Sequence, residues 1–410
     1  MKVAVVPIGT RGDVQPMLAL AQGLRAAGHD VRVGAPPNFR AWIESLGFSF
    51  EPVGVDLQAY LREHAGSLSG NPLTIVRAAR AFLAEQLRQQ FVQTAKVAEG
   101  ADVILGAGLQ LAAPSIAEHQ GIPCVGVVYA PNLLRSALHA PPFYPWQGLS
   151  PWLNRLLWRT NSWVWNGFIR GPLNVARRGH GMRPIPDIVP HLFELDILVA
   201  AESTFAPSDP AWTAKRRTVG FLYLDDPTPL DPALDAWLSD GEPPVFVGFG
   251  SMSTDDTPRV QREVMAALRA LKRRVLLSAG WAGLGADGVP EGWRVIADAP
   301  HAALFPRCAA IVHHGGSGTT AQALRAGVPQ VVVPHALDQF YFGERVRRLG
   351  LGSAPLPVAS LRAERLRLAV EHALAIPKDR CVEAASKVDP RATVEASVRF
   401  VEAIVAARTR

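Results

Sequence analysis

Short apolar runs alternate along nearly the whole chain with stretches in which apolar residues recur at helical spacing. A short apolar run indicates a strand, and recurrence at intervals of three and four residues indicates a helix. Their regular alternation is typical of βα units, whose strands form parallel sheets. Strands are predicted at residues 3–7, 31–35, 103–105, 124–128 and 197–200, and in the second half at residues 245–248, 275–278, 294–297, 309–313 and 330–333.

Helical periodicity follows many of these runs. The first helix is expected at residues 15–27, where Gly28 ends it. Further helices are predicted at residues 259–271, 319–326, 339–349 and 393–407.

A segment rich in proline and aspartate, residues 222–244, separates the two halves and is the best linker candidate. The predicted fold class is α/β, with two Rossmann-like, doubly wound parallel-sheet domains facing each other across a cleft. The predicted divisions are residues 1–221, the linker 222–244, residues 245–390, and a closing helix at 391–410 as a candidate brace.

Composition supports a soluble globular protein. The 410 residues are 48% hydrophobic and 19% charged, which suits two domains of ordinary size. The net charge of +6 is spread without a lysine and arginine tract, so nucleic acid is not an expected partner. Cys124, Cys308 and Cys381 lack metal-ligand spacing and are interpreted as reduced core thiols. With no signal peptide or membrane-span pattern, a cytoplasmic protein is expected.

The stretch GTRGDVQP, residues 9–16, follows the first predicted strand. In open parallel sheets, ligands bind beyond the carboxyl ends of the strands. Asp13 at this place suits a general base that takes a proton from a hydroxyl, although it also suits a helix cap. Thr10 and Arg11 are candidates for the acceptor region.

The stretch HHGGSGTT, residues 313–320, joins a predicted strand to a helix. Glycines that expose the backbone at a helix amino terminus favour a phosphate ligand, here a diphosphate. His313 is the candidate donor to a phosphate oxygen, and His314 fits a core histidine better. The stretch is neither a Walker loop nor a dinucleotide fingerprint. The candidate phosphate-binding residues are His313, Gly315, Gly316, Ser317, Gly318 and Thr319.

Two further loops lie after predicted strands of the second half. GFGSMS, residues 248–253, offers backbone amides and the Ser251 hydroxyl, with Gly250 beside it, to the same anion. PHALDQFYFGERV, residues 334–346, places Asp338 and Gln339 where they suit a polyhydroxyl ligand, although an aspartate at a helix start is more often a cap.

Five of the ten tryptophans fall in residues 141–172. Trp152, Leu156 and Trp163 are among the apolar residues that repeat there at helical spacing. The first interpretation is a helix packed on its own domain. The alternatives are an apolar wall for the acceptor and a contact with a membrane surface.

Together these motifs resemble inverting glycosyltransferases of the two-Rossmann (GT-B) type, in the UDP-glycosyltransferase superfamily. The nearest groups are the sterol and lipid glucosyltransferases and the bacterial enzymes that glycosylate glycopeptides, polyketides and macrolides. The resemblance implies that Asp13 is the base, that His313 and the glycine-loop amides contact the diphosphate, and that Asp338 and Gln339 bind the sugar. It also matches Gly250 and Ser251 to the family's Gly-Ser turn.

The resemblance is incomplete near the nucleoside. Where plant relatives carry a Trp-x-Pro-Gln motif, this chain has Asp-Ala-Pro-His, so Pro300 and His301 are the candidate residues of the nucleoside region. The amino-terminal histidine of plant relatives is absent, which assigns the base role to Asp13.

The expected reaction is a single displacement with inversion and without metal or cofactor, and no Asp-x-Asp triplet occurs. UDP-glucose or a dTDP-deoxysugar is the expected donor, and an apolar hydroxylated molecule such as a sterol, hopanoid, polyketide or macrolide is the expected acceptor. A sugar-nucleotide 2-epimerase and a non-catalytic helper are the alternatives. Peripheral contact with the inner face of the membrane, and the choice between monomer and homodimer, stay open.

Overall fold

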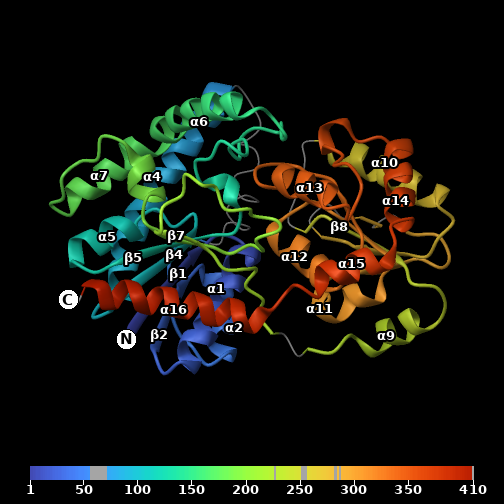
Figure 1. The fold of residues 1–410 in the computed structure, drawn as a ribbon, viewed down its shortest axis with the longest axis horizontal. Helices are drawn as coiled ribbons and strands as arrows, with labels where there is room; N and C mark the ends of the chain where they lie inside the picture. The colour runs from blue at the N-terminus through green and yellow to red at the C-terminus, as the bar shows by residue number, and fades with distance from the viewer. Residues whose placement is uncertain (56–71, 226–227, 251–255, 281–283, 286–287, 409–410) are drawn as a thin grey trace. The chain divides into compact units, whose positions relative to one another are not determined.

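The computed structural model describes residues 1–55, 72–225, 228–250, 256–280, 284–285 and 288–408 (Figure 1). Internal contacts divide the chain into two compact units. Unit 1 comprises Met1–Ser136, Arg155–Leu224 and Pro390–Arg410, and unit 2 comprises Ala137–Asn154 and Asp225–Asp389. By its contacts the closing helix therefore belongs to unit 1, whereas residues 137–154 belong to unit 2.

Unit 1 contains a seven-stranded sheet in which every pair of neighbouring strands is parallel. The order across the sheet is β3 (Ser49–Pro52), β2 (Asp30–Ala35), β1 (Lys2–Ile8), β4 (Val103–Gly108), β5 (Cys124–Val128), β6 (Asp196–Val199) and β7 (Arg216–Thr218).

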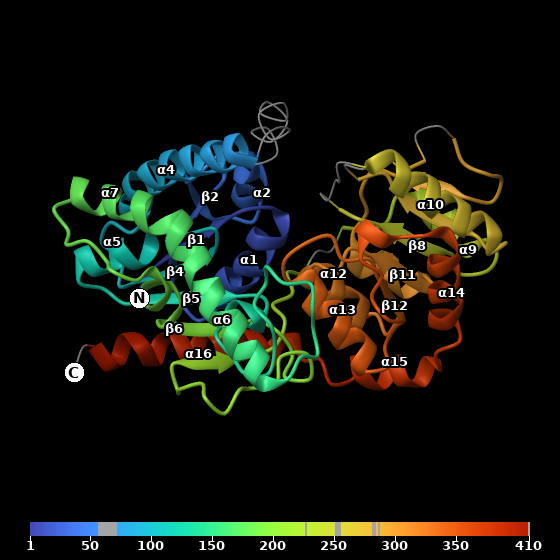
Figure 2. The same cartoon turned by 90° about the horizontal axis from the view of Figure 1, so that it is seen from above.

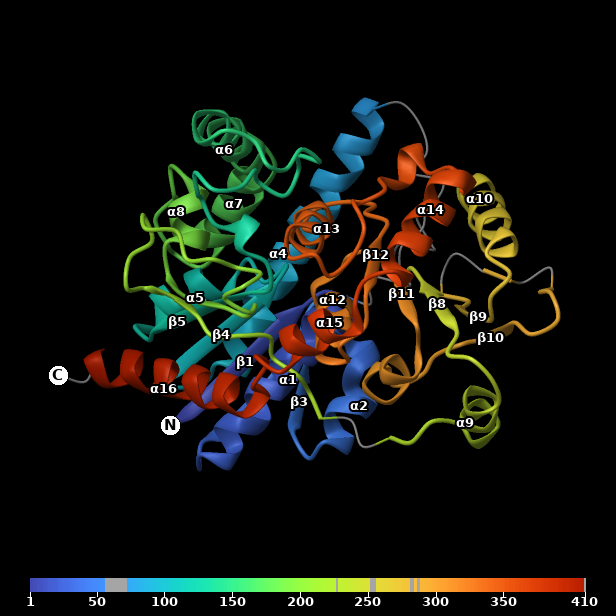
Figure 3. The same ribbon diagram turned by 45° about the vertical axis from the view of Figure 1, so that its right-hand side comes forward.

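Alternate residues of these strands enter two different cores. Val3 and Val5 face the core shared with the helices α1 (Arg11–Ala26) and α16 (Pro390–Arg408), whereas Ala4 and Val6 face the core shared with α4 (Pro72–Val97) and α5 (Ala113–Gln120). Figures 1 and 3 show helices on both faces of the sheet. Among the described residues, the helices of this unit are α1 (Arg11–Ala26), α2 (Arg40–Ser45), α4 (Pro72–Val97), α5 (Ala113–Gln120), α6 (Pro151–Trp165), α7 (Gly171–Gly179), α8 (Ile188–Phe193) and α16 (Pro390–Arg408). The helix α6 starts in residues assigned to unit 2.

Unit 2 repeats the arrangement with a five-stranded parallel sheet. The order is β10 (Arg294–Ile296), β9 (Val275–Ser278), β8 (Val245–Gly248), β11 (Ala310–His313) and β12 (Gln330–Val332). Figure 2 shows its helices around the sheet. They are α9 (Pro232–Ser239), α10 (Thr257–Ala270), α11 (His301–Leu304), α12 (Ser317–Arg325), α13 (Gln339–Arg348), α14 (Ala363–Leu374) and α15 (Lys378–Ala385).

The predicted fold class is confirmed, and so is the place of each predicted strand. The first helix was predicted to begin at residue 15, but α1 begins at Arg11, so Arg11 and Asp13 lie in its first turn rather than in a loop. Strands β3 and β7 were not predicted.

The candidate linker contains the short helix α9, which Asp231 caps by accepting a hydrogen bond from Leu234 N. The three cysteines are free and buried, as predicted.

Candidate active site

In unit 1 the strand order reverses between β1 and β4, which pair in parallel up to Ile8 opposite Gly108. Such a switch point leaves a crevice outside the carboxyl ends of the two strands, where open α/β sheets bind their ligands. Only Gly9 and Thr10 separate β1 from α1, so the first turn of α1 lies at this place. Asp13 is the acidic residue of that turn.

Asp13 closes a capping box with Thr10, the residue that precedes the helix. Its Oδ2 accepts hydrogen bonds from Thr10 N at 2.8 Å and from Thr10 Oγ1 at 3.2 Å. The predicted cap role of Asp13 is therefore real, in the form in which the third helical residue reaches back to the residue before the helix. These bonds fix the carboxylate and use one of its two oxygens.

Two glycines make room for the Asp13 carboxylate. A Cβ at Gly9 would overlap Oδ2, and a Cβ at Gly108 would lie 3.0 Å from Oδ1 and would overlap the carbonyl oxygen of Ile8. Gly108 has φ of +66°, a conformation that favours glycine. The Tyr129 hydroxyl donates a hydrogen bond of 2.5 Å to the Asp13 carbonyl oxygen. Gly108 and Tyr129 were not predicted as site residues, although both follow predicted strands.

Burial raises the pKa of Asp13 to about 6, even though the hydrogen bonds from Thr10 lower it. Loss of water around the carboxylate disfavours the charged form, which is why its proton is bound more tightly. A carboxyl group with a pKa near the working pH is ionised above pH 6 and still basic enough to take a proton. The environment of Asp13 thus suits a general base.

The other predicted residues of this stretch have structural partners. Thr10 serves the capping box, as described above. The guanidinium of Arg11 lies 5.1 Å from the ring centroid of Trp42, at cation–π distance. Their contact with an acceptor stays a prediction.

Unit 2 has its own switch point, between β8 and β11, which pair in parallel up to Gly248 opposite His313. The glycine loop follows β11, and α12 begins at Ser317 with Gly316 as the residue before it. Gly315 has φ of +92°, and a Cβ there would crowd Val332 and Gln339. The amides of Ser317, Gly318 and Thr319 form the first turn of α12, the part of a helix that binds anions.

His313 is fully buried, and both of its ring nitrogens are paired. Nδ1 accepts a hydrogen bond of 3.1 Å from Gly315 N, and Nε2 lies 2.9 Å from Gln330 Oε1. Because Nδ1 accepts, the proton is on Nε2, which donates to the Gln330 amide oxygen. Burial lowers the pKa of His313 to about 4. This histidine holds the start of the glycine loop against β12.

His314 was expected to fit the core better than His313, and which of the two rings contacts a phosphate stays a prediction. His314 is partly exposed, whereas His313 is completely buried. Its ring lies against two glycines, since a Cβ at Gly316 would contact Nε2 and a Cβ at Gly250 would lie 3.4 Å from Cε1. Nδ1 has no hydrogen-bond partner among the described residues, and burial lowers the pKa of His314 to about 3. A neutral imidazole thus lies beside the glycine loop.

Asp338 and Gln339 are at the amino end of α13, after β12. The Gln339 side chain is buried, and its Oε1 accepts hydrogen bonds from His335 N at 2.7 Å and Ala336 N at 3.1 Å. Leu337, the residue before Asp338, is half exposed and has φ of +54°, which is strained for a residue with a side chain. Non-glycine residues in this conformation are often found at ligand sites. Sugar binding by Asp338 and Gln339 stays a prediction.

Pro300 and His301 start the short helix α11. The His301 ring stacks on Phe305, with 4.3 Å between ring centroids, and packs edge-on against Phe246 at 5.9 Å. Nucleoside contact by these residues also stays a prediction. Ser251 lies outside the described residues.

The tryptophan segment forms α6, and its apolar residues are not mainly core. Trp152 is 66% exposed and Trp163 is 75% exposed, whereas Trp158 is 3% exposed. Packing on its own domain therefore explains Trp158 but is wrong for Trp152 and Trp163.

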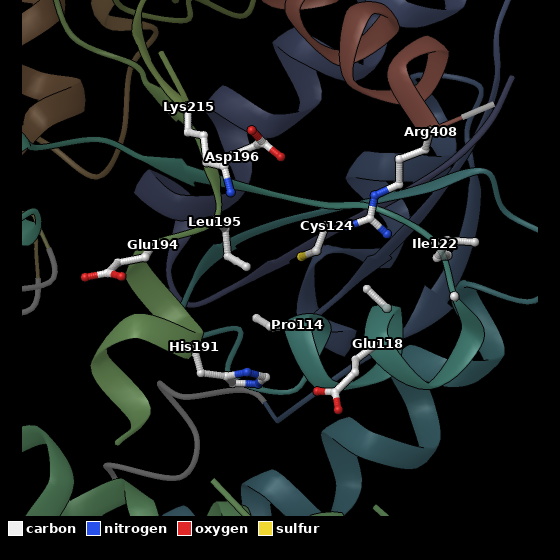
Figure 4. A pocket seen from close by; sticks show the side chains of 12 residues that line it. Pro114, Glu118, Ile122, Cys124, His191, Glu194, Leu195, Asp196, Lys215 and Arg408 are labelled. Carbon is white, nitrogen blue, oxygen red and sulfur yellow. The ribbon is translucent and has the colours of Figure 1, made fainter. Parts of the chain in front are cut away.

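A separate cavity of about 400 Å³ lies in unit 1, at the amino ends of β5 and β6 (Figure 4). Figure 4 shows the His191 ring directed toward Glu118 and the Arg408 guanidinium directed toward Cys124. Glu118 is ion-paired at 2.8 Å with the buried Arg177, and burial lowers the pKa of His191 to about 4. None of the predicted site residues lines this cavity. It lies at the amino ends of the strands, whereas Asp13 lies beyond their carboxyl ends.

Two further findings concern metal and membrane. Within the described ranges, no group of three or more His, Cys, Asp or Glu side chains is arranged to hold a metal ion. None of the helices that the structure describes is both long and apolar enough to cross a membrane.

Comparison of the sequence with known proteins identifies both halves. Residues 3–138 match the glycosyltransferase family 28 N-terminal domain. Residues 262–398 match the C-terminal domain of proteins like erythromycin biosynthesis protein CIII. Glycosyltransferase GtfE of Amycolatopsis orientalis is 36% identical over 86% of this chain and 86% of its own length.

Two other relatives are similar over most of the chain. The vancomycin aglycone glucosyltransferase of Amycolatopsis orientalis is 35% identical over 87% of each protein. Sterol 3-beta-glucosyltransferase UGT80B1 of Arabidopsis thaliana is 31% identical over 91% of this chain, which spans 63% of that longer protein.

The solved structures agree on the fold. The kitacinnamycin glycosyltransferase aligns with a TM-score of 0.73 over 98% of each chain at 21% identity. VinC, solved in complex with dTDP, aligns with a TM-score of 0.65 over 100% of each chain at 23% identity. The fold is that of the GT-B glycosyltransferases. The chain belongs to this family, with a family 28 amino-terminal half and an EryCIII-like carboxyl-terminal half.

Proposed function

We propose that the protein is an inverting glycosyltransferase that moves a hexose from a nucleoside diphosphate sugar to a hydroxyl group of a small apolar acceptor. The observation that carries this proposal is the Asp13 carboxyl group, held at the switch point of unit 1 with its pKa raised to about 6. A base of this kind is what direct attack by a hydroxyl group on a sugar carbon requires.

In the proposed step, Asp13 Oδ1 takes the proton of the acceptor hydroxyl. Among the described residues Oδ2 receives both hydrogen bonds to this carboxylate, so Oδ1 is the oxygen left for the proton. The acceptor oxygen forms a bond to the anomeric carbon from the face opposite the leaving group. The bond from that carbon to the diphosphate oxygen breaks, and its electron pair leaves with the nucleoside diphosphate. A single displacement of this kind inverts the anomeric configuration.

The residues of unit 2 supply the leaving-group site. The first-turn amides of α12 donate to the diphosphate, and the positive end of the helix dipole stabilises its growing charge. His314, which lies over Gly316 and Gly250, donates a further hydrogen bond as a neutral imidazole. His313 acts through the loop that it holds. These groups meet the charge of the leaving diphosphate without a metal ion.

The relatives support the substrate class. Their names describe glucosyl transfer to a sterol and to the vancomycin aglycone, and VinC was solved with dTDP. We infer UDP-glucose or a dTDP-deoxysugar as donor and an apolar hydroxylated acceptor such as a sterol or polyketide.

Thermal shift of the purified protein with UDP, dTDP, GDP and NAD tests the proposal before any acceptor is known. A ligand that binds only the folded state raises the melting temperature by mass action. A selective rise with UDP or dTDP is expected and names the donor series. A rise with NAD alone, or no rise with any of these at millimolar concentration, would contradict the proposal.

A further inference from the structure

The outward face of α6 is apolar and basic, whereas its inward face carries asparagines. Trp152, Leu156, Arg159 and Trp163 are spaced by four, three and four residues, which places them on one side of a helix. All four are exposed. Tryptophan and leucine thus lie outside, the reverse of the usual pattern for a surface helix.

The inward face explains why these side chains point outward. Trp158 and Asn161 are 3% and 2% exposed. Directly after α6, Asn166 ties the chain to the start of α8, since its Nδ2 donates to Asp187 Oδ1 at 2.8 Å and its Oδ1 accepts from Ile188 N at 3.1 Å. Because these contacts fix the rotation of the helix, Trp163 cannot turn inward without breaking them.

The same region is free of negative charge in the sequence. Residues 119–186 contain no aspartate or glutamate, in a chain that has 36. Arg155 and Arg159 are exposed on α6, and Arg170 and Arg178 are exposed just beyond it. Val175 on α7 adds apolar surface and is 62% exposed. In Figures 1 and 2, α6 runs along the outside of unit 1. The arginines of residues 119–186 are Arg135, Arg155, Arg159, Arg170, Arg177, Arg178 and Arg183.

We propose that the exposed face of α6, which carries Trp152, Leu156, Arg159 and Trp163, docks on the surface of an anionic lipid bilayer. Tryptophan rings lie well at the level of lipid headgroups, and arginines attract anionic lipids, so the two residue types favour the same surface. The helix lies on the membrane and does not cross it. The docking goes beyond the proposed transfer reaction and does not depend on it. Uptake of an apolar acceptor directly from the bilayer would be its consequence and rests on the proposed function.

Flotation of the full chain with vesicles tests the proposal without turnover. The vesicles contain phosphatidylcholine alone or an equal mixture with phosphatidylglycerol. The wild-type protein is expected to float with the anionic vesicles only, and less at high salt, because salt screens exposed charges. Equal recovery with both kinds of vesicle, or with neither, would overturn the proposal.

Matched variants locate the surface. Arg155→Gln with Arg159→Gln is expected to weaken anionic vesicle binding at least tenfold, since each basic residue near a membrane contributes about fivefold. Arg262→Gln with Arg269→Gln, on the exposed side of α10, changes the charge equally and should leave binding within about twofold. If both double variants lose the same amount of vesicle binding, the protein is attracted by its net charge alone, and the proposal that α6 provides the binding surface is refuted.

A second pair of variants tests the contribution of apolar side chains to vesicle binding. Trp163→Ser should weaken vesicle binding at least fivefold, whereas Leu368→Ser on α14, which is 50% exposed, should not. If Trp163→Ser instead turns a dimer into a monomer in light scattering and leaves vesicle binding unchanged, the face covers a second copy of the chain and the proposal fails. Both replaced side chains are exposed, so unchanged melting curves will show that the variants fold.

Discussion

The two sheets have the same order around their switch points but provide opposite chemistry there. At the switch point of unit 1 lies a carboxyl group whose pKa burial raises to about 6. At the switch point of unit 2 lie two histidines whose pKa values burial lowers to about 4 and 3. Loss of water disfavours charge in both places, so it yields a basic carboxylate in one and neutral hydrogen-bond donors in the other. The fold thus buries a titratable side chain at each switch point, and the type of side chain determines whether burial raises or lowers its pKa.

The largest effect is expected from Asp13→Asn. An amide cannot take the acceptor proton, so kcat/KM should fall by about a hundredfold to ten-thousandfold. The dissociation constant for UDP or dTDP, measured by calorimetry, should stay within about twofold, because the proposed diphosphate site consists of residues of unit 2 and does not include Asp13. Asp30→Asn, an exposed change at the start of β2, is the control and should keep full activity. Normal turnover by Asp13→Asn would refute the base assignment.

Gly108→Ala tests whether the Asp13 carboxylate needs the space above Gly108. The new methyl group would overlap the Ile8 carbonyl oxygen and crowd Asp13 Oδ1, so kcat should fall by about a hundredfold, as expected when a reacting group is displaced. Gly100→Ala is the matched control, since Gly100 has nearly the same φ, +69°, and a Cβ there would contact nothing within 4 Å. It should cost about 1 kcal/mol of stability and no activity. Equal activity in the two variants would contradict the packing argument.

The two neighbouring histidines should separate binding from stability. His314→Ala should weaken UDP or dTDP binding by about tenfold, with little change in melting temperature, because it removes one hydrogen bond to a charged ligand.

His313→Ala is the contrasting change. It should lower the free energy of unfolding by about 3 kcal/mol, since it leaves a buried cavity and removes the hydrogen-bond donor to Gln330 Oε1. Calorimetry and chemical denaturation of both variants check this pair. Unchanged nucleotide affinity in His314→Ala would refute its phosphate contact.

A smaller effect concerns stability. The folded-state pKa of Asp13 lies above the unfolded value of 3.8, so its protonated form favours folding. That contribution is complete below pH 3.8 and is lost as the pH rises through 6, at a cost of at most about 3 kcal/mol. Asp13→Asn should therefore melt above the wild type at pH 7.5 and close to it at pH 4. A variant less stable than the wild type at pH 7.5 would contradict the burial argument.

The sequence predicted the parts of the fold that burial dictates. The strands near each sheet centre are apolar on both faces, so they appear as apolar runs. The two missed strands, β3 and β7, lie at the two edges of the seven-stranded sheet. They carry charged residues such as the partly exposed Glu51 and the exposed Arg217, so no apolar run marks them.

The sequence predicted which residues belong to the candidate site but not how their side chains are placed. Asp13 and the glycine loop follow predicted strands, whereas Gly108 reaches the Asp13 carboxylate only because β4 lies beside β1. Adjacent histidines at the end of a strand buried on both faces give no signal of which ring is enclosed. The helical spacing of the tryptophans likewise predicted a helix but not its rotation, which Asn166 fixes through contacts far along the chain.

The pH dependence of kcat/KM for sugar transfer tests the central claim most directly. If Asp13 is the base, the rate should rise tenfold per pH unit at low pH and level off above an apparent pKa near 6. The residual rate of Asp13→Asn should lack this rise. A wild-type rate that does not change between pH 4.5 and 8, or the same rise in Asp13→Asn, would contradict the assignment of the base.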